Sequence, residues 1–234
     1  MANMKISVVK LGLIEYQTAF DLQQKLLKLR QQGLIEDVLL LLEHPPVITV
    51  GVNGKETNIL VNEEVLEQRG VKVYHANRGG DVTYHGPGQI VGYPILNLTN
   101  HGKDVRSYIR RIEEIFIRLL KEEYGLIADR DTAYPGVWVG NDKIVAVGCA
   151  MKRWVTMHGF AFNVNTCLEH FHWIISCGIS NRGVTSLEKL LEMPQDIEKN
   201  EELVIKHFSS VFQVEPIIVE KEEFLKKITG LDYE

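Results

Sequence analysis

The amino-acid sequence predicts one α+β domain in which a mixed or antiparallel β-sheet is flanked by helices. Short apolar runs separated by glycine and other turn residues fill the middle of the chain, a pattern typical of strands joined in hairpins. Longer segments carry apolar residues every three or four positions, which indicates amphipathic helices. No repeat, low-complexity tract or linker-like stretch divides residues 1–234, so we expect a single domain.

The first half of the chain predicts three strands and two helices. Residues 5–11, 38–42 and 47–50 are rich in valine, isoleucine and leucine, which favours strands. Residues 15–32 have apolar residues at helical spacing, and Gly33 is suited to end that helix. Residues 104–124 show the clearest amphipathic pattern, with Asp104 placed to cap the start and Gly125 placed to end it.

The second half predicts strands first and then helices. Strands are expected at 91–98, 136–139, 143–151 and 154–164, separated by glycine, Asn-Asp and Lys-Arg turns. Helices are expected at 186–193, 197–212 and 221–228, with Pro194 and Pro216 between them.

Composition narrows the function classes. The 234 residues include 45% hydrophobic residues and carry a net charge of −5, so a substantial core is expected and a nucleic-acid partner is not. No apolar run reaches membrane-spanning length, so we expect a cytoplasmic protein with no membrane partner. Cys149, Cys167 and Cys177 lack metal-type spacing, which predicts neither a disulfide framework nor a metal site. A thiol in a reducing compartment could act as a nucleophile.

Residues 78–89 form the densest group of unusual residues. Four glycines allow the backbone to approach a ligand closely, and arginine, threonine, tyrosine and histidine side chains supply hydrogen-bond donors. The alternative is a glycine-rich hairpin on the surface. The pattern matches neither a phosphate-binding loop nor a dinucleotide fingerprint. We therefore predict that this loop contacts a ligand, whose identity the residues of the loop do not specify.

Two residues are candidates for covalent chemistry, each with an ordinary alternative. Cys177 lies beside a glycine at the end of a strand-like run, although single cysteines are often buried hydrophobic residues. Lys143 follows an Asn-Asp turn, where most lysines are solvated. An ammonium group next to Cys177 would lower the pKa of the thiol from about 8.5 toward neutrality. His85 and His158 offer an alternative Cys–His pairing.

Five sequence blocks resemble the lipoate-biosynthesis octanoyltransferases. They are residues 78–89, 143–148, 154–164, 177–179 and 184–187, in the family's order and at similar spacing. The first block is specific, whereas the last carries no weight alone. The chain departs from the family pattern at Ser176, where proline is frequent, and at Cys149, where valine or a similar residue is frequent.

The resemblance implies a fold and a reaction. The fold would be that of the biotin/lipoate protein ligase catalytic domain, with mixed β-sheets flanked by helices. The reaction would transfer an octanoyl group from octanoyl-acyl carrier protein, through a cysteine thioester, to a lysine of a lipoyl domain. The acceptors implied are the lipoyl domains of 2-oxoacid dehydrogenases and the glycine cleavage H protein, and no cofactor or metal is implied.

The resemblance also assigns residues. Cys177 corresponds to the acyl-accepting cysteine and Lys143 to the lysine that activates it. The acyl site would be lined by Arg78, Gly79, Gly80, Asp81, Val82, Thr83, Tyr84 and His85, by Ala146, Val147 and Gly148, and by Gly159, Phe160 and Ala161.

Three other functions are compatible with the same residues, and a surface for the acyl carrier protein is also expected. An ATP-using ligase of the same fold, a cysteine amidotransferase acting between lipoyl domains, and a non-catalytic binding protein remain open. Since acyl carrier proteins are typically acidic, a local basic patch is expected in spite of the negative net charge. Its candidates are Lys152 and Arg153, or Arg106, Arg110 and Arg111.

Overall fold

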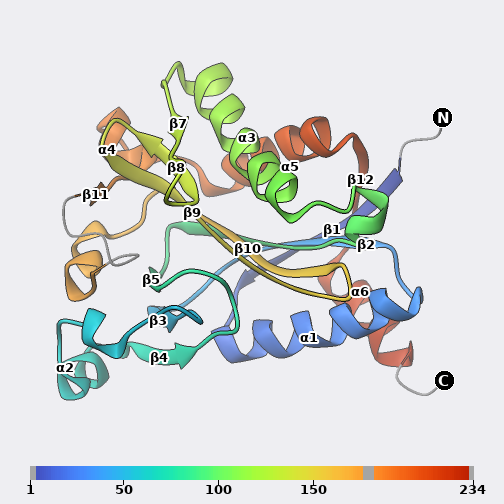
Figure 1. The fold of residues 1–234 in the computed structure, drawn as a ribbon, viewed down its shortest axis with the longest axis horizontal. Coiled ribbons are helices and arrows are strands. Elements are labelled where there is room, and N and C mark those ends of the chain that lie inside the picture. Colours follow the sequence, from blue (N-terminus) through green and yellow to red (C-terminus); the bar gives the residue numbers. More distant parts are fainter. Residues whose placement is uncertain (1–3, 176–181, 232–234) are drawn as a thin grey trace.

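A computed structural model describes residues 4–175 and 182–231. Its larger sheet has nine strands in the order β12-β1-β2-β6-β10-β9-β8-β7, and β11 pairs with β9 at the side (Figure 1). These strands are β1 (Met4–Leu13), β2 (Asp37–Glu43), β6 (Gln89–Ile95), β7 (Asp129–Arg130), β8 (Gly136–Val139), β9 (Asp142–Lys152), β10 (Val155–Asn163), β11 (Gly183–Val184) and β12 (Val214–Ile218).

The large sheet is mixed. β1 runs parallel to β2 and β12, and β11 runs parallel to β9, whereas the other pairs are antiparallel. β2 lies in the middle and carries a continuous apolar run, Val38 to Leu42, because helices cover both of its faces.

Two pairs of helices cover the two faces of this sheet. On one side lie α3 (Val105–Tyr124) and α5 (Ile197–Phe212), and on the other lie α1 (Tyr16–Gln32) and α6 (Lys221–Gly230) (Figure 1). Asp104 caps α3 by accepting hydrogen bonds from the backbone of Arg106 and Ser107, and Gly125 ends it in a left-handed conformation. Gly33 ends α1 in the same way, so the predicted helix ends are confirmed.

A smaller sheet packs beside the large one. Its order is β4-β3-β5, from β3 (Val47–Val50), β4 (Lys72–His75) and β5 (Val82–His85). The helices α2 (Glu63–Gln68) and η3 (Leu168–Trp173) contribute Leu66 and Phe171 to its core. The remaining short helices are η1 (Glu56–Asn58), η2 (Leu98–Asn100) and α4 (Leu187–Leu191).

The expected α+β class with a mixed sheet is confirmed, but some elements differ. β4, β12 and α2 were not expected, and β5 lies in the segment expected to be a loop. β12 contains Pro216, and proline is tolerated there because β12 is an edge strand. β5 is only four residues long and lies between Gly80 and Gly86, so its local pattern resembles that of a turn.

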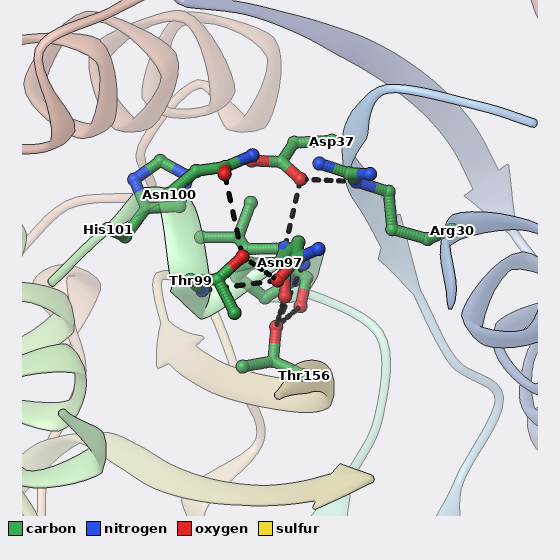
Figure 2. Close-up of polar contacts among 9 residues, drawn as sticks. Arg30, Asp37, Asn97, Thr99, Asn100, His101 and Thr156 are labelled. Carbon is green, nitrogen blue, oxygen red and sulfur yellow. Dashed lines mark hydrogen bonds and ion pairs between the residues drawn. The ribbon is translucent and has the colours of Figure 1, made fainter. Parts of the chain in front are cut away.

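A buried polar cluster joins α1, β2 and the 97–101 segment (Figure 2). The Asp37 carboxylate accepts hydrogen bonds from Arg30 Nε at 2.7 Å, from the Asn97 backbone at 2.9 Å and from His101 Nε2 at 2.7 Å. Burial acts to raise the pKa of Asp37, but these hydrogen bonds outweigh it and hold the pKa below its ordinary value. The cluster therefore holds a charged carboxylate that orients the chain entering η2.

Candidate active site

A cavity lies between the two sheets, with about 540 Å³ of empty space counted to its open mouth. The walls come from the 78–83 segment and β5, from β6, β9 and β10 of the large sheet, and from the start of α1. The lining residues are Tyr16, Arg78, Gly79, Gly80, Asp81, Val82, Thr83, His85, Val91, Tyr93, Lys143, Ala146, Val147, Gly148, His158, Gly159, Phe160 and Ala161.

This single cavity brings together three sequence segments that are far apart along the chain. Lys143 and all the residues expected to line an acyl site are among its walls, except Tyr84. The pairing of β9 with β10, in which Gly148 lies opposite Gly159 and Ala146 opposite Ala161, places the second and third segments side by side. Small residues on both strands leave the space that the cavity occupies.

Arg78 fixes the glycine-rich segment against the small sheet. Its Nη2 donates to the Thr49 carbonyl at 2.7 Å and to the Thr49 hydroxyl at 2.8 Å. The next residue connects to the large sheet, because the Gly79 N–H donates to the Cys149 carbonyl at 2.9 Å. A Cβ at Gly148 would lie 3.1 Å from the Gly79 carbonyl oxygen, so glycine permits this close approach.

Asp81 stabilises the same turn. Its carboxylate accepts from the Val82 backbone N–H at 2.7 Å and from Asn58 Nδ2 at 2.7 Å. These bonds tie the segment to the 51–58 loop. The carboxylate thus has a structural task within the cavity wall.

Tyr84 differs from the expectation, because its side chain lies outside the cavity. Successive side chains of a strand point to opposite faces, and Thr83 and His85, the neighbours of Tyr84 in β5, line the cavity. The Tyr84 ring packs edge-on against Phe171 and Trp173, and its hydroxyl is 2.6 Å from His170 Nδ1. Its surroundings belong to the core of the small sheet.

A chain of side-chain amides sets the tautomer of His85. Asn163 Nδ2 donates to the Thr185 carbonyl at 3.0 Å, and Gln89 Nε2 donates to Asn163 Oδ1 at 2.9 Å. The Gln89 Oε1 atom must then accept from His85 Nδ1, at 2.7 Å. His85 therefore carries its proton on Nδ1, and Nε2 keeps a lone pair.

Three buried histidines around the cavity are neutral. Burial, assisted by neighbouring positive charge that includes Arg78, lowers the pKa of His85 and of His158 to about 3. Burial likewise lowers the pKa of His44 to about 4. His44 donates from Nδ1 to the Ile14 carbonyl at 2.7 Å and accepts from the Tyr93 hydroxyl at 2.8 Å. His158 donates to Asn77 Oδ1 at 2.7 Å.

Lys143 is buried, unlike an ordinary turn lysine. Its side chain enters the cavity wall from the start of β9, and the residue is only 5% exposed. Nζ donates to the Pro135 carbonyl at 3.3 Å and lies 4.7 Å from the centroid of the Trp138 ring. A cation over an indole face is a favourable placement. Lys143 is thus held by a carbonyl and an aromatic ring at the wall of the cavity.

Cys177 lies outside the described residues. The chain on each side of the 176–181 segment is anchored near the cavity. The Ile175 N–H donates to the Asn58 carbonyl at 2.8 Å, beside the small sheet. On the other side, Val184 pairs with Lys143 in the β11–β9 register, and the Thr185 N–H donates to the Lys143 carbonyl at 2.9 Å.

The other two cysteines are described. Cys149 is partly buried on β9, and burial raises the pKa of its thiol to about 11, so it is a weak nucleophile near neutral pH. Cys167 is exposed and precedes η3. His170 of η3 stacks on Trp173 and contacts the Tyr84 hydroxyl.

Tyr16, Val91 and Tyr93 also line the cavity and were not expected from the sequence. Burial raises the pKa of Tyr16 to about 12, and its buried hydroxyl has no hydrogen-bond partner among residues 4–175 and 182–231. In the sequence these residues are simply apolar positions of a helix and a strand. Only the tertiary arrangement identifies them.

The candidate basic residues have different environments. Arg153 is exposed in the turn between β9 and β10. Arg106 and Arg110 line an open groove on α3 together with Arg130. Arg111 does not belong to this surface, because it donates to the Val211 carbonyl and its guanidinium carbon lies 4.2 Å from the centroid of the Phe212 ring. Within 4–175 and 182–231, no helix has the length and apolar character needed to cross a bilayer.

Comparisons with known proteins agree on a family. The model of the lipoyl protein ligase A/B catalytic domain matches residues 15–209. An octanoyltransferase of Desulforamulus reducens is 59% identical over 227 residues, which cover 97% of this chain and 99% of that protein. An octanoyltransferase of Caldicellulosiruptor saccharolyticus is 56% identical over 221 residues, covering 94% of each.

Solved structures share the fold at low sequence identity. The bi-partite lipoate protein ligase of Thermoplasma acidophilum superposes with a TM-score of 0.74 at 16% identity, covering 99% of this chain and 93% of that one. Lipoate-protein ligase A bound with ATP gives a TM-score of 0.71 at 15% identity, covering 100% and 96%. With a family model that spans most of the sequence and relatives of more than half identity, the chain belongs to the lipoyl protein ligase A/B catalytic domain family.

Proposed function

We propose that this protein is an octanoyltransferase of lipoate biosynthesis, which moves an octanoyl group from acyl carrier protein to a lysine of a lipoyl domain. The observation that carries the proposal is the cavity, which combines an apolar space with buried Lys143. The octanoyltransferases that are 59% and 56% identical to this chain support the choice of acyl group. The E2 lipoyl domain studied with the Thermoplasma ligase supports the choice of acceptor.

The apolar walls suit a medium-length acyl chain. Val91, Ala146, Val147, Phe160 and Ala161 line the space between β6, β9 and β10. Burying about seven CH₂ and CH₃ groups contributes about 0.8 kcal/mol each, or roughly 5 kcal/mol. The neutral histidines nearby add no charge that would oppose this burial.

Cys177 is the nucleophile in this proposal. It is separated by one residue from Ile175 and by six from Val184, and both of those residues are anchored near the cavity. A thiolate at Cys177 attacks the carbonyl carbon of the carrier thioester. The bond to the carrier sulfur breaks, and the departing thiolate takes a proton from the Lys143 ammonium.

The second half-reaction returns the enzyme to its starting state. A neutral lysine amine of the lipoyl domain attacks the octanoyl-Cys177 thioester and forms an amide, and the Cys177 thiolate leaves. The proton lost by the amine passes to the neutral amine of Lys143, which restores the ammonium. Converting a thioester to an amide is downhill, so this route needs no ATP.

Each tetrahedral intermediate needs donors for its oxyanion. Two backbone N–H groups of the glycine-rich segment are engaged elsewhere, since Gly79 donates to Cys149 and Val82 donates to Asp81. The Lys143 ammonium and N–H groups around Cys177 are the donors that the proposal assigns.

Intact mass spectrometry tests the proposal directly. Incubation with octanoyl-acyl carrier protein in the absence of ATP should add one octanoyl group, labile to hydroxylamine, which peptide mapping places on Cys177. Addition of a lipoyl domain from a 2-oxoacid dehydrogenase, or of the glycine cleavage H protein, should then move the group to the domain's lysine.

Two matched cysteine variants complete this experiment. Cys177→Ser should form no thioester adduct, whereas Cys149→Ser should behave like the unmodified protein. An adduct on Cys149 or Cys167, or the absence of any adduct, would contradict the assignment. Transfer that requires free octanoate and ATP would identify a ligase instead.

A further inference from the structure

One peptide group lies between two charged side chains at the wall of the cavity. The carbonyl of Pro135 accepts a hydrogen bond from Lys143 Nζ at 3.3 Å. The N–H of the same peptide belongs to Gly136 and donates to Glu113 Oε1 at 3.0 Å. The described residues contain no cis peptide bond, so this carbonyl and this N–H point in opposite directions. Glu113 and Lys143 therefore bind opposite sides of one amide.

Glu113 is an unusual residue for its position. It lies on α3 between the core residues Ile112 and Ile115 and is only 4% exposed. Burial raises the pKa of Glu113, whereas the Gly136 N–H and the charges of Arg130, Arg110 and Lys143 act to lower it. Since a buried carboxylate is costly unless it is hydrogen-bonded and paired, its occurrence here requires a specific set of partners.

Gly136 makes this arrangement possible. Its φ of 139° is accessible to glycine but rarely to other residues. A Cβ at this position would lie 2.5 Å from the Val145 carbonyl oxygen and 3.3 Å from Lys143 Cε. Only glycine lets the peptide reach the lysine side chain on one side and the carboxylate on the other.

We propose that Glu113 is a positioning residue for Lys143 in acyl transfer. Its carboxylate orients and polarises the Pro135–Gly136 amide, so that the carbonyl holds the Lys143 ammonium at the cavity wall. Hydrogen bonds in series strengthen one another, and the effect is larger in a low-dielectric interior. This inference rests on the proposed function, because it concerns the lysine that moves the proton.

The neighbouring charged groups are consistent with this role. Arg130 of β7 lies 3.3 Å from Glu113 Oε2 and also pairs with Glu114. Arg110 contributes a further positive charge from α3. Arg182 pairs with Asp131 at 2.6 Å and lies 4.7 Å from the centroid of Trp138, the ring that also contacts Lys143. Among the groups described, Glu113 is the acid bonded to the amide that holds Lys143.

The test compares the pH dependence of transfer in Glu113→Gln with that of the unmodified protein. Glutamine can still accept from the Gly136 N–H but carries no charge, so the ammonium form of Lys143 loses a favourable interaction. We expect the alkaline limb of kcat/KM to move to lower pH by about half a unit to one unit, which lowers kcat/KM about three- to tenfold at any pH on that limb. KM for the carrier should change little, because Glu113 does not line the cavity.

Glu114→Gln is the matched control. It removes one negative charge from the next position of α3 and from the same Arg130, but Glu114 makes no bond to the Pro135–Gly136 amide. Its pH profile should coincide with that of the unmodified protein. An equal displacement in both variants would show a general effect of charge and would overturn the proposal. So would a Glu113→Gln profile identical to that of the unmodified protein.

Glu113→Asp provides a second test if the glutamine variant does not fold. It keeps the charge but shortens the side chain by one CH₂ group, which draws the carboxylate away from the Gly136 N–H. Transfer should be several-fold slower, and an unchanged rate would overturn the proposal. If the unmodified protein transfers no octanoyl group, both this inference and the proposed function are overturned. If it transfers the group and the Glu113 variants have the same rate and pH profile, this inference alone is overturned.

Discussion

Acidification from pH 7 to pH 5 should destabilise this protein through the three neutral histidines at the cavity. An unfolded histidine has a pKa of about 6.5, whereas the folded pKa values are about 3 for His85 and His158 and about 4 for His44. Between pH 7 and pH 5 the unfolded chain therefore binds protons that the folded chain does not. A group whose folded pKa is depressed stabilises the fold above its unfolded pKa and loses that contribution as pH falls.

The magnitude follows from these values. At pH 5 each unfolded histidine is almost fully protonated and each folded one is almost fully neutral, which costs about 2 kcal/mol per histidine relative to pH 7. The three together should lower the free energy of unfolding by about 6 kcal/mol. The pKa values of Glu113 and Glu201 are raised by burial, so these two groups act in the opposite direction, at the acidic end of the window.

Urea unfolding at pH 7, 6 and 5 measures this slope. His158→Asn is the informative variant, because asparagine tolerates the positive φ of 57° found at this residue. It should reduce the drop between pH 7 and pH 5 by about 2 kcal/mol, whatever its effect on absolute stability. His172→Asn, at an exposed position of η3, should leave the drop unchanged. A wild-type drop below about 1 kcal/mol, or one that is unaltered in His158→Asn, would refute the reasoning.

Three further predictions concern the proposed reaction. Lys143→Ala should slow transfer by about 10²- to 10⁴-fold and slow iodoacetamide alkylation of Cys177 near pH 7, with recovery at high pH. Lys143→Arg should retain the alkylation of Cys177 but lose transfer, since arginine does not release its proton. Normal turnover in Lys143→Ala would contradict the proposal that Lys143 acts together with Cys177. Ala161→Leu adds three carbon atoms to the cavity wall and should lower kcat/KM for octanoyl relative to hexanoyl substrate at least tenfold, as measured with the two carriers in parallel. Raising the salt concentration should lower kcat/KM for the acyl carrier, and charge reversal at Arg110 or Arg153 should flatten this dependence; a rate indifferent to salt would show that docking is apolar.

Local patterns in the sequence predicted most helices and strands. The ends of α3 follow from Asp104 and Gly125, because capping depends on residues within one turn of the helix. The segments that line the cavity could also be chosen from the sequence, but through resemblance to a family and not through spacing. Residues 78–85, 146–148 and 159–161 are separated by up to 83 positions, and no local pattern indicates that they meet.

Pairings between distant parts of the chain could not be predicted in this way. β1 pairs with β12 although about 200 residues separate them, and parallel neighbours of this kind are joined through crossovers that leave no turn signature. The same limit explains why Tyr84 was wrongly expected to line the cavity. Side chains alternate along β5, and that of Tyr84 points away from the cavity. That strand could not be distinguished from a glycine-rich turn.

By itself, the sequence determined the α+β class, most of the helices and strands, and Lys143 and Cys177 as candidates for the chemistry. The tertiary structure alone decided that Lys143 is buried against Pro135 and Trp138, that three histidines around the cavity are neutral, and that Glu113 binds the other side of the Pro135–Gly136 amide. These properties depend on desolvation and on hydrogen bonds between strands and helices remote in sequence. They arise only when the two sheets and α3 pack together.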